Sequence, residues 1–230
     1  MSPDDFKRLM EDAATVDILR NDNLLVPARP ITHCWFPLSG MVSLIALDAD
    51  GNEAEVGIAG NDGMVDVATI LGDNRVMMRV LVQISGTAVR VDARRLQDAL
   101  RDSPALLKLL LAYARAFSLQ VSSSALAFAQ YSIEQRLARW VLMCADRVGE
   151  TKIALTHEAL SIMLGVRRAG VTQAMQSLEG KGMIANVRGV VSITSRSELL
   201  AAAGGGYGMP EAEYERLLGY APQLLAARAS

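Results

Sequence analysis

The sequence contains little cysteine, little histidine and few aromatic residues. Its two cysteines, Cys34 and Cys144, each lack a second thiol nearby, and we expect both to be small buried residues. The wide separation of the two cysteines in the sequence excludes a CxxC metal or redox site, and two cysteines are too few for four-cysteine iron–sulfur ligation. With only His33 and His157, a catalytic or metal cluster would depend mainly on carboxylates. Because no HExxH, GxSxG or GxxxxGKS/T motif is present, we expect no enzyme.

A membrane span and a secretory signal are also missing from the pattern. The first residues, MSPDDFKRLMEDAAT, are acidic and have no apolar signal core. One of the two longest uncharged stretches, between Arg115 and Glu134, contains five serines and two glutamines, which makes it too polar to span a membrane. We therefore expect a soluble, cytoplasmic protein. Half of its residues are hydrophobic and only 5% are aromatic, so aliphatic side chains must fill its cores.

Charge is unevenly distributed along the chain. Residues 1–103 contain 16 Asp and Glu against 10 Lys and Arg, whereas residues 132–200 contain nine bases against six acids. The net charge of −2 is therefore the sum of an acidic N-terminal segment and a basic C-terminal segment. This asymmetry favours a two-part protein whose C-terminal part faces a polyanion.

The first third of the chain alternates short β-prone runs with turns. The candidate strands are residues 31–36, 41–47, 53–58, 76–84 and 87–91. Strands of this length and spacing predict an antiparallel barrel or a double-sheet jelly roll. We expect residues 76–84 and 87–91 to form a hairpin through Ser85-Gly86, and residues 64–71 to form a short helix.

A long helix is predicted after the barrel, beginning at Pro104, behind a short helix that Asp92 caps over residues 93–100. One line of residues has the alternating four- and three-residue spacing of a coiled coil: Leu107, Leu111, Ala114, Ser118, Val121, Ala125 and Phe128. The opposite line is apolar too: Leu106, Leu110, Tyr113 and Phe117. Two apolar faces indicate two partners, the barrel and a second subunit, and hence a homodimer. The alternative is a helix wholly inside one monomeric core.

Residues 132–179 have the pattern of three helices. Ser132 and Gln135 fit a capping box that begins a helix ending near Gly149. Thr156 is a good N-cap for the next helix, and Gly165 can adopt the left-handed backbone that a tight turn requires. The helix after this turn has an apolar face made of Val166, Val171, Ala174, Met175 and Leu178. Gly170 inside it costs about 1 kcal/mol relative to alanine, which indicates close approach of a neighbouring segment.

The other face of that helix is polar. Its outward residues are Arg167, Arg168, Ala169, Thr172, Gln173 and Gln176. Arginine reads guanine through two hydrogen bonds and glutamine can read adenine, so this face predicts a recognition helix. Residues 183–187 and 190–194 predict a hairpin with Arg188 at its basic tip. Helix, turn, helix and β-wing in this order predict a DNA-binding winged helix.

These segments together resemble the Crp-Fnr family of bacterial transcription regulators. The resemblance covers about residues 20–200 and is most specific in Leu155–Glu158, Leu164–Thr172 and Leu178-Glu179. Residues 133–140 are similar to the helix that follows the family's dimer interface, and residues 36–43 and 55–58 are similar to its barrel. The resemblance implies a homodimer bound to a two-fold-related DNA site, with RNA polymerase as a further expected partner.

The resemblance also implies roles for single residues. Arg168 corresponds to the base-reading arginine, while Thr156 and His157 correspond to phosphate-contacting positions at a helix N-terminus. Ala169 and Gln173 stand where the cyclic-AMP receptor protein has Glu and Arg, so the operator sequence stays open.

The match to a cyclic-nucleotide site is poor. Barrels resembling this one use a Gly-Glu pair for the ribose and an Arg-Ser/Thr pair for the phosphate, and here Val65-Asp66 and Arg75-Val76 occupy those places. Aspartate is shorter than glutamate, and Val76 has no hydroxyl. An effector pocket of the family's kind would be formed by Asp66, Arg75, Ser122 and Ser123. We expect no cofactor: neither cyclic AMP nor haem, and no metal.

The predicted fold class is α+β. We expect a jelly-roll sensor barrel at residues 1–103, a dimerisation helix at 104–131, a winged helix-turn-helix at 132–203 and a tail at 204–230. In the tail, residues 204–206 are predicted to be a flexible joint and residues 211–218 a short helix. The predicted function is sequence-specific, DNA-binding transcription regulation by a homodimer whose barrel senses an unknown signal or none. The alternative is a scaffold whose winged helix binds protein.

Overall fold

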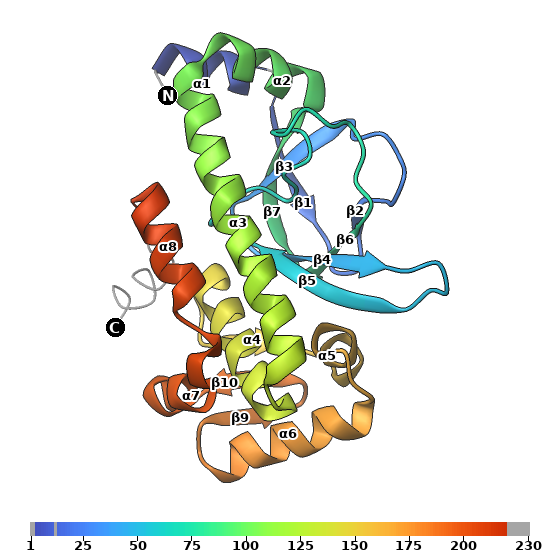
Figure 1. Ribbon diagram of the computed structural model, residues 1–230, viewed down its shortest axis with the longest axis vertical. Helices are drawn as coiled ribbons and strands as arrows, with labels where there is room; N and C mark the ends of the chain where they lie inside the picture. Colours follow the sequence, from blue (N-terminus) through green and yellow to red (C-terminus); the bar gives the residue numbers. More distant parts are fainter. Residues whose placement is uncertain (1–2, 12, 220–230) are drawn as a thin grey trace. The chain divides into compact units, whose positions relative to one another are not determined.

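The computed structural model describes residues 3–11 and 13–219 (Figure 1). The chain divides into two compact units, each treated by itself below. The first unit contains the residues up to Ser118 except Glu53–Glu55, which belong with the second unit and the residues from Leu119 on. The boundary lies inside a long helix, so the segment expected to be a separate dimerisation helix is shared by both units.

Two antiparallel sheets form the first unit. One sheet has the order β1 (Ala14–Ile18), β7 (Gly86–Asp92), β3 (His33–Pro37), and the other has the order β2 (Asn23–Leu25), β6 (Arg79–Ile84), β4 (Met41–Leu47), β5 (Glu53–Ala59). Two helices, α1 (Pro3–Met10) and α2 (Ala93–Asp102), contact each other, and Asp92 caps α2 as expected. The core is aliphatic, and Leu44, Ile45, Val80 and Val82 are fully buried. The predicted double-sheet barrel is confirmed, although β1, β2 and α1 were not predicted.

The expected hairpin between residues 76–84 and 87–91 is wrong, because β6 and β7 lie in different sheets. The chain crosses from one sheet to the other at Ser85. The segment between β3 and β4 also connects the two sheets. The two links touch, since a Cβ atom on Gly86 would lie 2.3 Å from the carbonyl oxygen of Ser39. Only glycine permits this approach. Residues 64–71 form turns rather than the expected short helix.

The long helix α3 (Pro104–Gln130) is confirmed, together with the face predicted to pack on the barrel. Leu106, Leu110, Tyr113 and Phe117 are buried, and the Tyr113 hydroxyl donates a hydrogen bond to the carbonyl oxygen of Met64 at 2.6 Å. Within the described part of the chain, α3 is the one helix whose length and composition would suit a membrane span, a test that core helices of soluble proteins also pass.

The second predicted face of α3 is only partly covered. Leu111, Ser118 and Ala125 are exposed, Leu107 and Val121 are half-buried, Ala114 is buried, and Phe128 is half-buried. Leu111 exposes 44% of its surface, as much as Leu109 of the same helix. Leu111 and Ala125 are therefore exposed apolar positions on this line.

The second unit is a helical bundle with a small antiparallel sheet. Its elements are α4 (Ile133–Val148), β8 (Lys152–Ala154), α5 (His157–Leu164), α6 (Arg168–Gly180), β9 (Ile184–Val187), β10 (Val190–Ile193), α7 (Arg196–Ala202), a 3-10 turn (Gly204–Gly206) and α8 (Met209–Leu218). The sheet has the order β8-β10-β9. The predicted capping box at Ser132 and Gln135 is present, and Gly149 ends α4 with φ of +73°.

The predicted flexible joint at residues 204–206 is wrong. Gly206 is buried, and a Cβ atom there would lie 2.9 Å from the Tyr131 ring. The Nε atom of Arg139 also donates to the carbonyl oxygen of Gly206 at 2.9 Å. The glycines therefore allow the chain to pass close to α4, and the predicted helix that follows is confirmed as α8.

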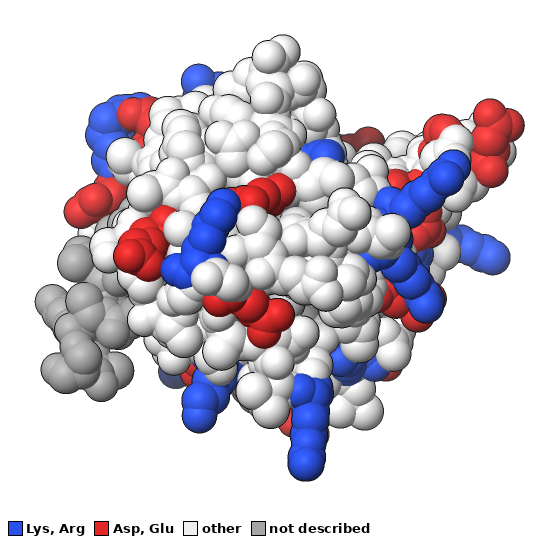
Figure 2. Space-filling model, turned by 90° about the horizontal axis from the view of Figure 1, so that it is seen from below, with Lys and Arg blue, Asp and Glu red and all other residues white. Residues whose placement is uncertain are grey.

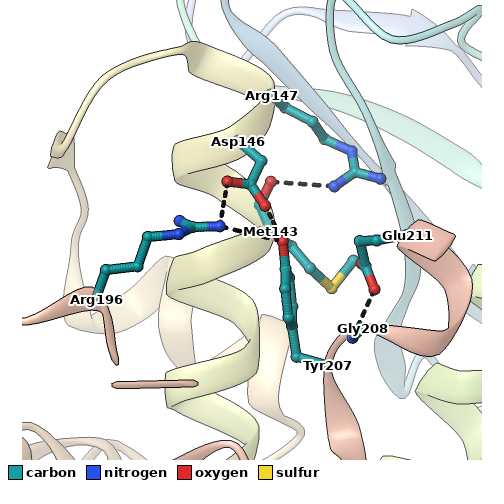
Figure 3. Close-up of polar contacts among 7 residues, drawn as sticks. All are labelled: Met143, Asp146, Arg147, Arg196, Tyr207, Gly208 and Glu211. Carbon is teal, nitrogen blue, oxygen red and sulfur yellow. Dashed lines mark hydrogen bonds and ion pairs between the residues drawn. The ribbon is translucent and has the colours of Figure 1, made fainter. Parts of the chain in front are cut away.

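A buried charged cluster fastens the C-terminal segment to α4 (Figure 3). The Asp146 side chain is 1% exposed, and its carboxylate pairs with Nη2 of Arg196 at 2.8 Å. The Tyr207 hydroxyl donates to the same carboxylate, and burial together with this negative charge raises the pKa of Tyr207. Glu211 accepts a hydrogen bond from the backbone N–H of Gly208 at 2.8 Å. A buried carboxylate needs such partners, because an unpaired charge is costly.

We expect Asp146→Ala to lower the free energy of unfolding by about 3–5 kcal/mol, because it removes one partner of a buried ion pair. Tyr207→Phe should cost about 1–3 kcal/mol, because Asp146 then loses one donor. Urea unfolding of the full chain, followed by circular dichroism, measures both changes.

The matched control is Arg216→Ala, which breaks an ion pair with Glu213 on the surface of α8. Exposed pairs contribute little, so this variant should unfold like the wild type. A loss as large as that of Asp146→Ala would contradict the importance given to the buried cluster.

Candidate nucleic-acid interface

The motif of α5 and α6 begins and turns where the sequence predicts. The Thr156 hydroxyl accepts a hydrogen bond from the backbone N–H of Ala159 at 3.2 Å, which caps α5. Gly165 ends that helix with φ of +60°, and a Cβ atom there would lie 3.3 Å from the Phe128 ring. A larger residue would therefore meet both backbone strain and a crowded neighbour.

α6 has one buried and one exposed face. Val171, Ala174, Met175 and Leu178 are buried, and Val166 before the helix is half-buried. Of the residues predicted to face outward, Arg167, Arg168, Ala169, Gln173 and Gln176 are exposed and Thr172 is half-buried. The predicted division of the helix into two faces is confirmed.

Gly170 allows α6 to approach α4. A Cβ atom at this position would lie 3.1 Å from Cδ1 of Ile133, which is tighter than ordinary packing. The close approach predicted from the helix-interior glycine is therefore present. At the other end of α6, Glu134 of α4 accepts hydrogen bonds from the Ser177 hydroxyl at 2.6 Å and from Lys181 Nζ at 2.5 Å. α6 is thus held against α4 at both ends.

The turn between α5 and α6 is fixed by a side chain of α4. Nη1 of Arg136 donates to the carbonyl oxygen of Leu164 at 2.8 Å, and its guanidinium carbon lies 5.5 Å from the centre of the Phe128 ring. An adjoining cavity of about 20 Å³ has room for a water molecule only. Beside it, the indole N–H of Trp140 donates to Glu55 at 2.6 Å.

The wing is a tight hairpin with a predominantly exposed tip. β9 pairs with β10, and the turn residues Arg188 and Gly189 have φ of +52° and +79°. Arg188 is exposed, and Val187 exposes 66% of its surface. The sheet has a third strand, β8, which pairs with β10 and was not predicted. This strand attaches the wing to the segment that leads into α5.

Polar contacts join the start of α5 to the first turn of α6. The Thr172 hydroxyl donates to the carbonyl oxygen of Arg168 at 3.1 Å, and it also lies 3.3 Å from Nδ1 of His157. Oε2 of Glu158 lies 3.2 Å from Nη2 of Arg168. Glu158 was not among the predicted site residues, because its side chain meets Arg168 only after the turn brings the two helices together. The structure therefore brings His157, Arg168 and Thr172 together, whereas Arg188 lies on the separate wing.

Among the described residues, the Lys and Arg side chains visible in Figure 2 do not form a continuous basic patch. Viewed from the side where α6 and the β9–β10 hairpin lie in Figure 1, basic groups stand apart from one another with acidic groups between them (Figure 2). Binding of a polyanion to such a surface depends more on the positions of individual cations than on a strong overall electrostatic field.

The predicted effector residues are divided between the two units, and each group is described by itself. Asp66 is buried and accepts a hydrogen bond from the backbone N–H of Ala68 at 2.8 Å, and burial raises the pKa of its carboxyl group. Arg75 is exposed, and within the described residues no hydrogen bond or ion pair joins it to Asp66. Ser122 is exposed and Ser123 is buried, and both belong to the second unit. A cavity of about 300 Å³ in the first unit is lined by residues that include Thr32, Thr69 and Arg94, but neither by Asp66 nor by Arg75.

Both cysteines are buried, as predicted. The Cys34 thiol donates to the Thr69 hydroxyl at 3.5 Å, and burial raises the pKa of Cys34 to about 11. Burial also raises the pKa of Cys144. A protonated, buried thiol is a poor nucleophile. In the described ranges, no group of three or more His, Cys, Asp and Glu could hold a metal ion.

Comparison with known proteins shows a matching domain family and similar solved structures. Residues 135–202 match the family described as the Crp-like helix-turn-helix domain. FixK2 from Bradyrhizobium japonicum has a similar structure, with a TM-score of 0.72 and 14% identity over 84% of this chain and 98% of that one. TTHB099 from Thermus thermophilus, a CRP-family transcriptional regulator, has a TM-score of 0.68 and 16% identity over 83% of this chain and 97% of that one.

A third similar structure is CLP from Xanthomonas campestris, a regulator responsive to c-di-GMP. Its TM-score is 0.66, with 16% identity over 84% of this chain and 99% of that one. At these identities the likeness shows the fold. No curated protein sequence matches this chain significantly.

The contact of Glu134 with α6 makes stability depend on pH. Hydrogen bonds from Lys181 and Ser177 hold the pKa of Glu134 below its ordinary value. Its contribution is therefore present above the ordinary glutamate pKa and is lost as the pH falls through the lower, folded-state pKa. We expect Glu134→Gln to be less stable than the wild type at neutral pH, with the difference shrinking under acid conditions. Urea midpoints over a series of pH values test this, and a difference independent of pH would contradict it.

Proposed function

We propose that the chain, in which residues 135–202 match the Crp-like helix-turn-helix domain, is a DNA-binding transcription regulator of the Crp-Fnr type that reads a two-fold-related DNA site as a homodimer. The observation that supports this most directly is α6, whose apolar face is buried while Arg167, Arg168 and Gln173 are exposed. A helix presented in this way can enter the major groove, whose base edges distinguish all four base pairs.

The proposed roles follow from the chemistry of each side chain. Arg168, at the first position of α6, contacts a guanine through two hydrogen bonds, and Gln173 and Gln176 contact bases further along the groove. Ala169 is too small to add a polar contact. Arg167, Thr172 and the wing residue Arg188 contact the DNA backbone or adjacent base edges. Thr156 and His157 contact phosphate oxygens, for which a helix N-terminus is a favourable site.

The partly covered line on α3 supports the proposed homodimer. Leu111 and Ala125 are exposed and Leu107 and Val121 half-buried, at coiled-coil spacing along one helix. A second α3 packed on this line would cover them. Phe128 already packs against Arg136 within its own unit, so we assign it to the support of the turn as well as to the seam. Contact with RNA polymerase and a cytoplasmic location stay predictions that follow from this function.

We also propose that the barrel does not hold cyclic AMP in the manner expected of its relatives. The carboxylate of Asp66 is buried and engaged with the backbone of Ala68. Burial raises its pKa and so disfavours a charged ribose-binding group. The barrel then senses another signal or acts without one, and no cofactor is assigned to it.

Electrophoretic titration of the purified protein at several salt concentrations tests DNA reading. We expect log affinity to fall steeply as log salt rises. Arg168→Ala should lose about 1–3 kcal/mol of discrimination at one base position, whereas Arg167→Ala should weaken binding to all sequences alike. Salt-independent binding, or none, would favour a protein-binding scaffold instead.

Charge placed on the exposed part of α3 tests the dimer. We expect Leu111→Glu and Ala125→Glu to give monomers in sedimentation equilibrium, with greatly weakened binding to a two-fold-related site, because burying a carboxylate in an apolar seam is costly. Leu109→Glu, on an exposed leucine outside the seam, is the control and should stay dimeric. In the dimer bound to DNA, the two α6 helices should lie about 34 Å apart, one turn of the duplex. Dimeric seam variants would show that the interface lies elsewhere.

A further inference from the structure

The ion pair between Glu158 and Arg168 joins the two helices of the motif where α6 begins. Its Oε2 and Nη2 atoms are 3.2 Å apart, and the side chains are 73% and 67% exposed. Glu158 lies in the first turn of α5, where the helix dipole favours a carboxylate. An exposed pair contributes little to stability, so its main consequence is the direction in which the Arg168 guanidinium points.

Two neighbouring features make this pairing selective for Arg168. The Thr172 hydroxyl donates to the backbone carbonyl of Arg168 and lies beside His157, which places the first turn of α6 against the start of α5. Arg167, the preceding residue, is exposed as well, but it has no carboxylate partner among the residues that the structure describes. Of these two adjacent arginines, only one has its guanidinium held by a carboxylate.

We propose that Glu158 is a specificity-determining residue that positions Arg168 for base contact and disfavours its use on phosphate. The inference rests on the proposed role of α6 as the reading helix. A guanidinium has five N–H donors, so a contact with Glu158 through Nη2 leaves enough donors to bind O6 and N7 of a guanine. The Glu158 carboxylate repels phosphate, so binding is penalised wherever Arg168 meets phosphates alone. Specificity of this kind depends on a repulsive element as well as an attractive one.

The test compares two duplexes of equal length. One is selected by the wild-type protein from a random-sequence pool, and the other is a scrambled version of it. We expect Glu158→Gln to bind the scrambled duplex more tightly than the wild type does, because one repulsive charge is gone. It should bind the selected duplex no more tightly, because Arg168 is less well oriented. The ratio of the two affinities should fall about tenfold, within the range of one bidentate base contact.

Two controls separate positioning from a general effect of charge. Glu150→Gln removes an exposed acid of the same unit that has no contact with Arg168, and it should change both affinities by the same factor. In an Arg168→Ala background, Glu158→Gln should leave the affinity ratio unchanged, because the side chain it positions is absent. Thermal unfolding of each variant should match its parent, since the pair is exposed.

The outcomes distinguish this inference from the function on which it rests. If the wild type prefers its selected duplex and Glu158→Gln keeps the full preference, Glu158 does not determine specificity, and the reading role of α6 stands. The same conclusion follows if Glu158→Gln and Glu150→Gln behave alike. If the wild type itself has no preference for any duplex, both the proposed function and this inference are wrong.

Discussion

The packing of α6 against α4 is the constraint on which the proposed DNA-binding surface depends. Gly170 permits the approach next to Ile133, and Glu134 holds the far end of α6 through Ser177 and Lys181. A recognition helix can place its side chains on base edges only if the helix itself is held by rigid neighbours. Buried apolar residues on one face therefore determine which polar residues remain on the other, and Arg168 is exposed for this reason.

α4 also connects the turn and the C-terminal segment to the same framework. Arg136 fixes the turn before α6, while Asp146, with Arg196 and Tyr207, fixes the chain that follows the wing. These are buried or half-buried polar contacts, which contribute to a unique arrangement when every partner is present and are costly when one is missing. The framework that supports the helix-turn-helix and its wing thus extends to at least Tyr207.

Local patterns predicted much of this structure. The caps at Thr156, Ser132 and Gly149, the left-handed Gly165 and the two faces of α6 all follow from side-chain chemistry over a few residues. Strand partners could not be predicted in the same way. Ser85-Gly86 has the composition of a hairpin turn, yet its glycine serves a passage between two sheets beside Ser39. The glycines at 204–206 likewise suggested a joint, whereas Gly206 is needed for close contact with Tyr131.

By itself, the sequence determined where α4 and α5 begin and end and which face of α6 is apolar, because hydrogen-bonded caps and helical periodicity are local properties. It also determined the residue types available for reading DNA. The tertiary structure decided which strands pair, that the glycines serve close contacts, and that Glu158 rather than another acid meets Arg168. These outcomes depend on residues distant in the chain arriving at the same place, and local preferences do not encode that distance.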